Sequence, residues 1–394
     1  MQKYYFQCVN CFQEFPGDPF LYLCPECSKT NVPYLPPKGV LWIRYDDEST
    51  NKKNIDTTLE SLIPLDSMDS MPPLKIGETP IYHYKELNNQ SIPFELLIKD
   101  ESQNPSYSFK DRASALVSAF AKENKYDTIV AASTGNAGSS LACICASQSQ
   151  KAVILLPEAA PEAKSVQVQM YGAQLIKVKG NYDVAFEESL RLGKINNWFN
   201  RNTAYNPLTI EGKKSVSFEI FKQLNGDIPD AIFIPVGDGV ILSGVYKGFE
   251  DLYSRKYIDK IPQIFAVQSN KSSNVFDNFK LDKPVFKSAS SLADSINVDV
   301  PRNFYMASYY LKKYNGNGIQ VSDSEIMDAS YILSSSFGLF AEPASAAAFA
   351  GFLKANETGL LNSTKKVLVL HTGSGLKDVF SAANYLNLNK RKEK

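Results

Sequence analysis

The chain has 394 residues, enough for two or three domains with large buried cores. Lysine plus arginine and aspartate plus glutamate number 42 each, so no net field attracts nucleic acid or an anionic membrane. No apolar run approaches the roughly 20 residues that cross a bilayer, and residues 1–5 lack the apolar core of a signal peptide. We therefore expect a cytoplasmic protein with no nucleic-acid or membrane partner.

The first predicted element is a metal site made of two Cys-x-x-Cys motifs. Cys8 and Cys11 form the first motif, and Cys24 and Cys27 form the second after twelve intervening residues. In a cytoplasmic chain this pairing is typical of a tetrathiolate zinc site rather than of two disulfides. Because sulfur would fill all four ligand positions, the zinc would be structural. The alternative is a set of thiols without a metal.

A proline-rich linker, residues 32–39, follows this module. From about residue 95, apolar strand-like runs alternate with helical patterns, which predicts an α/β fold with parallel-type sheets. The expected strands are Phe94–Ile98, Thr128–Ala132, Val153–Leu156, Gln174–Val178, Ala231–Val236, Gln263–Val267 and Lys366–Leu370. The expected helices are Ala113–Lys122, Ala137–Gln148, Glu162–Tyr171, Val184–Ile195, one that ends near Tyr253, and one that opens with a capping box at Ser322–Glu325.

Lys110 is a candidate nucleophile because of the sequence around it. It follows the turn-rich run Asn104–Ser108, which fixes where the chain enters the next helix. A lysine amine forms Schiff bases when its site is shaped for that chemistry. Taken alone, however, an exposed lysine at the start of a helix is the commoner interpretation.

Three glycine-containing loops follow predicted strands, at the edge where open α/β sheets bind ligands. Ser133–Gly138 and Gly237–Gly239 each precede a helix, whose first N–H groups can bind an anion. The second loop lacks the dinucleotide fingerprint because Leu242 stands where a glycine is needed, so it favours a single phosphate. Thr372–Asp378 is the third loop, with hydroxyls that can hydrogen-bond a ring heteroatom. For each loop, ordinary turn chemistry is the alternative.

In their order along the chain, these motifs resemble the threonine synthase-like branch of the fold-type II pyridoxal-phosphate enzymes, relatives of tryptophan synthase β and cysteine synthase. The resemblance covers nearly the whole length. It includes the cysteine pairs and the segments Gly39–Asp46, Gly77–Pro80, Asn104–Arg112, Ser133–Gly138, Glu211–Lys214, Pro235–Gly239, Glu342–Ala346 and Thr372–Asp378. It implies an α/β fold with two parallel-type domains and an N-terminal zinc ribbon, and pyridoxal 5'-phosphate with structural Zn²⁺ as cofactors.

The resemblance also implies roles for single residues. Lys110 corresponds to the catalytic lysine that binds the cofactor covalently, and Asn136 to the residue that contacts the 3-hydroxyl oxygen of the pyridine ring. The substrate carboxylate would be bound by a loop that contains Ser133, Thr134 and Gly135. The cofactor phosphate would be bound by Gly237, Asp238, Gly239, Val240 and Ile241. Thr372 corresponds to the partner of the pyridine nitrogen, and Glu342 to a residue near the ring.

The implied domains are residues 1–35 as zinc ribbon, 36–105 with 206–394 as the large cofactor domain, and 106–205 as a small domain that closes over the substrate. The implied reaction is that of a lyase or synthase on a small amino acid with an anionic leaving group. For threonine synthase, it converts O-phosphohomoserine and water to threonine and phosphate. A homodimer is expected from the same resemblance.

Three positions depart from the family's pattern. Tyr107 stands where a small residue is usual, and Ala137 where threonine synthases commonly carry threonine. Thr209 stands where an arginine often contacts the substrate phosphate. Without the arginine guanidinium, the phosphate loses a bidentate contact. Arg201 and Lys213 are cations that could replace it. Two other functions therefore stay open: β-replacement or β-elimination, as in a cysteate synthase that uses phosphoserine and sulfite, and a non-catalytic interaction protein.

Overall fold

The computed structural model describes residues 4–45, 59–87, 90–133, 135–158 and 162–392. The chain divides into two compact units, which we call unit 1 (Met1–Ile76 and Lys110–Ser215) and unit 2 (Gly77–Phe109 and Val216–Lys394). The domain boundaries predicted after residues 105 and 205 stay a prediction. None of the helices in the described ranges is both long and apolar enough to cross a membrane.

Unit 1 begins with a small antiparallel sheet of order β2-β1-β3. Its strands are β1 (Tyr4–Cys8), β2 (Glu14–Pro16) and β3 (Leu41–Tyr45), with the short helices η1 (Cys27–Thr30) and η3 (Met68–Ser70) beyond β2 and β3. The whole of β1 pairs with β3, from Tyr4 opposite Tyr45 to Cys8 opposite Leu41. The cysteine-bearing sheet therefore extends past residue 35, because β3 supplies one of its two edges.

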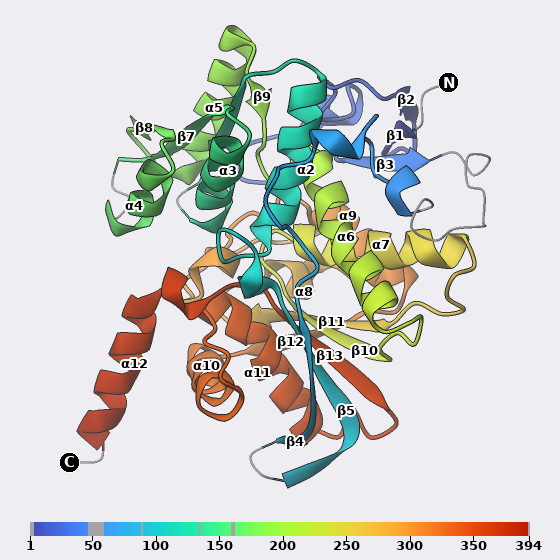
Figure 1. Cartoon of the computed structure of the whole chain (residues 1–394), viewed down its shortest axis with the longest axis vertical. Coiled ribbons are helices and arrows are strands. Elements are labelled where there is room, and N and C mark those ends of the chain that lie inside the picture. The colour runs from blue at the N-terminus through green and yellow to red at the C-terminus, as the bar shows by residue number, and fades with distance from the viewer. Residues whose placement is uncertain (1–3, 46–58, 88–89, 134, 159–161, 393–394) are drawn as a thin grey trace. The chain divides into compact units, whose positions relative to one another are not determined.

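The rest of unit 1 is a parallel sheet of order β8-β7-β6-β9 with helices in the crossovers. Its elements are α2 (Lys110–Glu123), β6 (Thr128–Ala132), α3 (Asn136–Ser147), β7 (Lys151–Pro157), α4 (Glu162–Met170), β8 (Gln174–Val178), α5 (Tyr182–Asn196) and β9 (Phe199–Asn200). Helices α3 and α5 lie against β6 and β7 (Figure 1). The core between these strands and α5 is built on Val130, Val153, Leu155 and Phe186. This confirms the alternation predicted for residues 113–195.

Helix α6 (Leu208–Gln223) runs from unit 1 into unit 2, where the six-stranded sheet has the order β12-β11-β10-β13-β5-β4. The sheet strands are β4 (Ile81–Leu87), β5 (Gln90–Asp100), β10 (Ala231–Pro235), β11 (Gln263–Ser269), β12 (Asn317–Val321) and β13 (Lys366–His371). All neighbours are parallel except β4, which pairs with β5 antiparallel. The sheet is therefore mixed, and the parallel-type prediction missed this edge strand.

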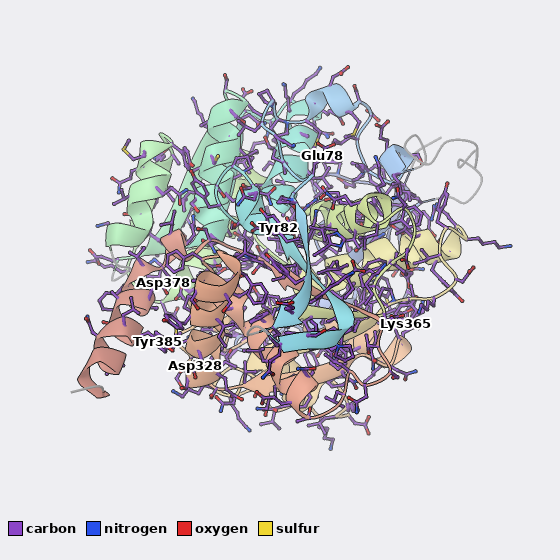
Figure 2. The ribbon with its side chains drawn as sticks, turned by 60° about the horizontal axis from the view of Figure 1, so that its bottom comes forward. Glu78, Tyr82, Asp328, Lys365, Asp378 and Tyr385 are labelled. Carbon is purple, nitrogen blue, oxygen red and sulfur yellow. The ribbon has the colours of Figure 1, made fainter. Side chains whose placement is uncertain are left out.

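The helices of unit 2 connect and cover that sheet. They are η4 (Glu101–Gln103), α7 (Val240–Ser254), α8 (Asn274–Asn278), η5 (Asp294–Ile296), α9 (Phe304–Lys313), α10 (Asp323–Phe337), α11 (Pro343–Glu357), η6 (Gly375–Lys377) and α12 (Val379–Lys392). The predicted capping box of α10 is confirmed, since the Ser322 hydroxyl accepts the Glu325 N–H and the Glu325 carboxylate accepts the Ser322 N–H. Helix α12 is tied to α10 through Tyr385, whose hydroxyl donates to Asp328 at 2.8 Å (Figure 2).

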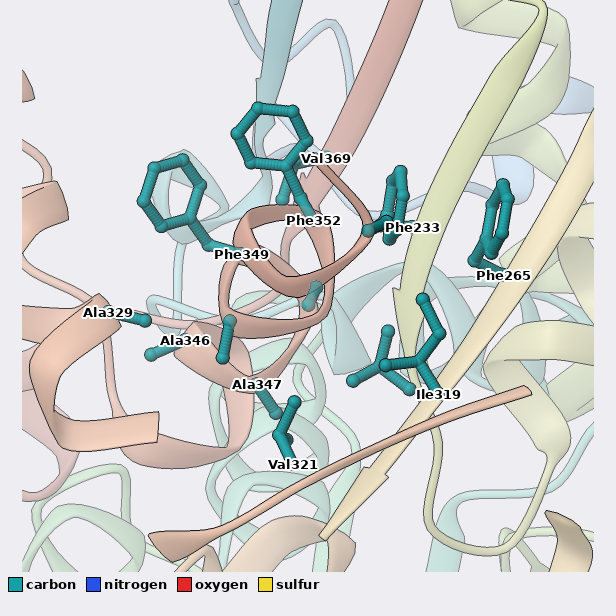
Figure 3. Close-up of a cluster of buried hydrophobic side chains, with 14 of the residues drawn as sticks. Phe233, Phe265, Ile319, Val321, Ala329, Ala346, Ala347, Phe349, Phe352 and Val369 are labelled. Carbon is teal, nitrogen blue, oxygen red and sulfur yellow. The ribbon is translucent and has the colours of Figure 1, made fainter. Parts of the chain in front are cut away.

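The core of unit 2 lies between the sheet and α11 (Figure 3). Phe233 and Phe265 stack from adjacent strands with ring centroids 4.6 Å apart, and the Phe352 ring meets Phe233 edge-on. The buried side of α11 is rich in alanine, including Ala346 and Ala347, so the helix can lie close to the strands. This packing keeps the strand ends of unit 2 in fixed positions, and several predicted functional residues lie at those ends.

Candidate active site

Lys110 is the first residue of α2, and the segment before it is held by the turn that follows β13. The Phe109 N–H donates to the carbonyl oxygen of Thr372 at 2.9 Å, and Ser108 forms an antiparallel bridge with Gly373. Both contacts lie within unit 2, whereas Lys110 opens the second part of unit 1. The Lys110 side chain is half-buried. The backbone is therefore held by hydrogen bonds up to Phe109, the residue directly before the predicted lysine.

Tyr107 has a left-handed backbone in this same segment. Its φ is 66°, its side chain is exposed, and its carbonyl oxygen accepts the Ser374 N–H at 3.1 Å. A residue with a Cβ pays roughly 1 kcal/mol or more for that conformation. The backbone thus explains why a small residue suits this position, and it makes Tyr107 a strained residue three positions before Lys110.

The Ser133 loop follows the carboxyl end of β6 and leads into α3. The Ser133 hydroxyl oxygen accepts the N–H groups of Gly135 at 3.3 Å and Gly138 at 2.9 Å. Gly135 is the N-cap of α3, and Asn136 is its first, buried residue. Thr134, predicted in the substrate loop, lies outside the described residues. The loop is therefore stabilised by the hydroxyl of one of its own residues, Ser133.

A buried network joins α2 and α3 one turn beyond the predicted functional residues. Ser114 lies four residues after Lys110, and Ser140 lies four residues after Asn136, so each is on the same face of its helix. The Ser140 hydroxyl donates to the Ser114 oxygen at 2.7 Å, and Arg201 Nε donates to the same oxygen at 3.2 Å. The Arg201 guanidinium is fully buried, and burial lowers its pKa to about 10.

The structure shows whether Arg201 or Lys213 can replace the phosphate-binding arginine that is absent at Thr209. Arg201 and Lys213 are both fully buried, and the Lys213 Nζ donates to the Thr209 carbonyl oxygen at 3.2 Å. The Thr209 hydroxyl donates to the Asn206 carbonyl oxygen at 2.8 Å, within the first turn of α6. Thr209 therefore serves the start of its own helix, and neither cation is exposed to receive a substrate phosphate.

The loop after β10 is the predicted phosphate site, with Gly237, Asp238, Gly239, Val240 and Ile241. Gly239 is the N-cap of α7, has a φ of 86°, and receives no side-chain cap from the described residues. The first N–H groups of α7 are therefore available to an anion, and a phosphate group fits this position. Asn303 holds the loop from outside: its Nδ2 donates to Gly239 O at 3.3 Å and to Ser243 Oγ at 2.7 Å.

Thr372 and Glu342 lie at one corner of unit 2. The Thr372 N–H donates to the Ser345 hydroxyl oxygen at 2.8 Å, and the Glu342 N–H donates to the Gly373 carbonyl oxygen at 3.2 Å. A Cβ added at Gly373 would lie 2.5 Å from the Glu342 carboxylate oxygen. Only glycine at this position lets the turn and the carboxylate come so close.

The topology explains which predicted residues come together. In unit 2, the neighbouring parallel strands β10, β13 and β5 end at one edge, leading into the Gly239 loop, Thr372 and the segment before Lys110. In unit 1, β6 ends at the Ser133 loop, and Lys110 and Asn136 open the two packed helices α2 and α3. In both units the predicted loops, which contain Ser133, Gly239 and Thr372, thus lie at the carboxyl ends of strands, where open α/β sheets bind ligands.

Sequence reasoning missed the residues that support this arrangement. Asn303 lies 64 residues beyond Gly239, and the only local signal at Asn303 is that asparagine suits a helix N-cap. Ser345 lies one helical turn from Glu342, inside the Glu342–Ala346 motif. Ser114 and Ser140 could have been found from their i+4 spacing to Lys110 and Asn136. Arg201 was named from its charge as a candidate for the substrate phosphate, and its place beside Ser114 had no local signal.

The four cysteines at the N-terminus form a compact cluster. Their sulfur atoms all lie within 4.8 Å of one another, with Cys8 and Cys27 3.7 Å apart and Cys11 and Cys24 3.8 Å apart. A tetrahedron with Zn–S bonds of about 2.3 Å has edges of about 3.8 Å. The Asn10 N–H also donates to the Cys8 sulfur at 3.4 Å. The donor set and its spacing therefore fit zinc.

A comparison with known families identifies the class of protein. The family model described as "Pyridoxal-phosphate dependent enzyme" matches residues 73–373. The chain belongs to the pyridoxal-phosphate-dependent enzymes. It is 31% identical to a threonine synthase of Methanocaldococcus jannaschii over 94% of this chain and 92% of that protein. It is 32% identical to a threonine synthase of Halalkalibacterium halodurans over 79% of this chain and 89% of that protein.

Solved structures of the same class share the fold. Threonine deaminase isoform 2 from Solanum lycopersicum superposes with a TM-score of 0.68 at 20% identity, covering 82% of this chain and 85% of that one. The recognition drawn from the motifs is confirmed, and so is a pyridoxal-phosphate-dependent lyase of the threonine synthase type. The α/β fold-type II architecture is confirmed as well, with its sheet of mixed direction.

Proposed function

We propose that this pyridoxal-phosphate-dependent enzyme is a threonine synthase, converting O-phosphohomoserine and water to threonine and phosphate. The likeness to threonine synthases at about 30% identity over nearly the whole chain carries this proposal. In the reaction, the C–O bond to phosphate breaks at Cγ, the water oxygen joins Cβ, and Cγ gains hydrogen to become the methyl group. Bound pyridoxal phosphate supplies the electron sink that makes Cα and Cβ acidic.

The residues divide the work. The Lys110 amine would hold the cofactor and then move protons at Cα and Cβ of the substrate. The N–H groups that open α7 would bind the cofactor phosphate, and the Thr372 hydroxyl would hydrogen-bond the pyridine nitrogen. Asn136 would contact the ring hydroxyl oxygen, with Glu342 nearby. The loop from Ser133 through Thr134 to Gly135 would orient the substrate carboxylate.

The first experiment tests the cofactor site. Wild-type protein with pyridoxal phosphate should show a visible absorption band, and borohydride should abolish this band and leave the cofactor covalently attached to the chain. Lys110→Ala should show neither the band nor the covalent attachment. Lys122→Ala is the matched control, because Lys122 is an exposed lysine near the other end of α2. A wild-type protein that gains no band would contradict the cofactor role of Lys110.

The second experiment identifies the substrate. The β-elimination alternative on an amino acid without phosphate, such as serine, gains support from Thr209, which stands where an arginine would face a phosphate and whose hydroxyl donates to the Asn206 carbonyl oxygen. The enzyme would be given O-phosphohomoserine, phosphoserine with sulfite, serine, and threonine in separate reactions, and the products identified. Threonine from the first reaction supports the proposal, whereas cysteate from the second would replace it. No product from any reaction, with the visible band absent, would favour the non-catalytic alternative.

We also propose that Cys8, Cys11, Cys24 and Cys27 bind a structural zinc ion. The sulfur spacing and the Asn10 N–H contact support it. Purified protein should contain zinc in a one-to-one ratio, and Cys11→Ser should lose it with a lower melting temperature. Cys143→Ser is the control, since Cys143 lies in α3 away from the cluster in sequence. Zinc-free protein with an unchanged melting temperature would contradict the site.

A further inference from the structure

His371 is a buried histidine directly before Thr372 that the proposed reaction does not use. It is the last residue of β13 and is 2% exposed. Its Nε2 lies 3.0 Å from the Gly373 carbonyl oxygen. A carbonyl oxygen can only accept a hydrogen bond, so Nε2 must carry a hydrogen for this contact to be favourable.

The other ring nitrogen faces a carboxylate. His371 Nδ1 lies 3.4 Å from Asp100 Oδ1 and has no hydrogen-bond partner in the described part of the chain. The sheet sets this pair, because β13 and β5 run parallel with His371 directly opposite Asp100. Asp100 Oδ1 already accepts the Ser102 N–H at 3.1 Å and the Ser102 hydroxyl at 2.6 Å, and its Oδ2 accepts a Gln103 N–H.

A neutral ring would leave a clash of lone pairs at this contact. With Nε2 protonated, a neutral imidazole has an unprotonated Nδ1, which would face an acceptor-only carboxylate oxygen. Burial lowers the pKa of His371 on balance, whereas the negative charge of Asp100, the Gly373 carbonyl and the negative charge of Glu101 act in the opposite direction. A proton between Nδ1 and Oδ1 removes the clash and leaves the pair without net charge, which is the least costly state for buried groups.

The Gly373 residue that His371 contacts is also bonded to two other segments of unit 2. It also accepts the Glu342 N–H, and Gly373 bridges Ser108 two residues before Lys110. The preceding residue, Thr372, accepts the Phe109 N–H. A displacement of this turn would therefore move Thr372 and the backbone that leads to Lys110 together.

We propose that His371 and Asp100 share one buried proton and so act as a positioning pair that fixes the Thr372–Gly373 turn. The functional part rests on the proposed role of Thr372 at the pyridine nitrogen. His371 touches the turn and is a positioning residue. The shared proton can be tested in the protein with or without the cofactor, so its failure is distinct from failure of the proposed function.

Nitrogen NMR of the imidazole rings tests the proton directly. The chain has two histidines, and His83 is exposed, so His83→Gln leaves His371 as a single signal. We expect both ring nitrogens of His371 to resonate as protonated at neutral pH, with a far-downfield proton on Nδ1 that Asp100→Asn removes. An Nδ1 that resonates as unprotonated in the presence of Asp100 would overturn the proposal.

Two variants and a control test the consequence for the enzyme. His371→Gln keeps an amide donor near the Gly373 carbonyl but removes the shared proton, and Asp100→Asn removes the carboxylate. Each should still form the visible band with pyridoxal phosphate while kcat falls roughly tenfold, on the scale of lost supporting contacts to reactive groups. Ser102→Ala removes the hydroxyl donor to Asp100 but keeps the backbone N–H donor and the His371–Asp100 pair, so it should retain kcat. An equal loss in Ser102→Ala, or unchanged kcat and band titration in both pair variants, would overturn the positioning role.

Discussion

Two loops of this enzyme look alike in sequence and are held in opposite ways. The Ser133 loop of unit 1 and the Gly239 loop of unit 2 each follow a parallel strand and open a helix with glycine at its N-cap. The first is fixed by its own Ser133 hydroxyl, and the second by Asn303, which is distant in sequence. A loop held from within depends on one local residue, whereas a loop held from outside depends on the fold around it.

Gly239→Ala should have the largest effect on stability and cofactor binding, because it changes the loop that is held by residues distant in sequence. A backbone φ of 86° is unfavourable for alanine, and the alanine Cβ would lie 2.8 Å from the Ala307 Cβ. We expect a loss of about 3 kcal/mol in unfolding free energy and of pyridoxal-phosphate affinity. Thermal and denaturant unfolding measure the first, and cofactor titration the second.

A double variant separates the two causes. Ala307→Gly removes the atom that the new Cβ meets, so Gly239→Ala with Ala307→Gly should recover the steric part of the loss and leave the backbone part. An additive loss in the double variant would show that the contact with Ala307 does not constrain this loop.

Asn303→Ala should have the next largest effect. It removes the donors to Gly239 and Ser243 in a fully buried site, which costs about 1–3 kcal/mol. We expect weaker cofactor binding with KM for the amino acid nearly unchanged once cofactor saturates. A KM that rises at saturating cofactor, with cofactor affinity intact, would break the comparison between the loops.

Ser133→Ala should have a smaller effect of the reverse kind. Losing the hydroxyl leaves the Gly135 and Gly138 N–H groups without this acceptor, at a cost of about 1 kcal/mol. We expect a several-fold rise in KM with unchanged cofactor affinity, as measured by steady-state kinetics and titration. Ser133→Thr, which keeps the hydroxyl, is the control, and an equal rise in KM there would argue against the hydrogen bonds as the cause.

Tyr107→Gly should have the smallest effect on stability. Glycine adopts the left-handed backbone without strain, which stabilises the folded variant. Glycine also has greater conformational freedom in the unfolded chain, which lowers the free energy of unfolding. The two roughly cancel, to within about 0.5 kcal/mol. Tyr107→Val, which cannot relax this backbone, should destabilise by roughly 1 kcal/mol or more. If both variants unfold alike, the strain assigned to Tyr107 is absent.

Much of the fold was predictable from local pattern. The strands Thr128–Ala132 and Gln174–Val178 have the predicted bounds, and the capping box at Ser322 forms as expected. The edge strand Ile81–Leu87 was missed because its apolar pattern is weak: most of its residues are partly or fully exposed. Its antiparallel direction comes from pairing with β5, which no local pattern states.

The candidate site divides in the same way. By itself, the sequence determined the elements, the order of the glycine loops, the cysteine pairs and the family, because backbone preference, apolar period and motif spacing act over a few residues. Tertiary structure alone decided that Asn303 holds Gly239, that His371 faces Asp100, and that the Thr372 turn fixes the backbone before Lys110. Each of these contacts joins segments whose approach is set by sheet order and core packing, which are properties of the folded chain as a whole.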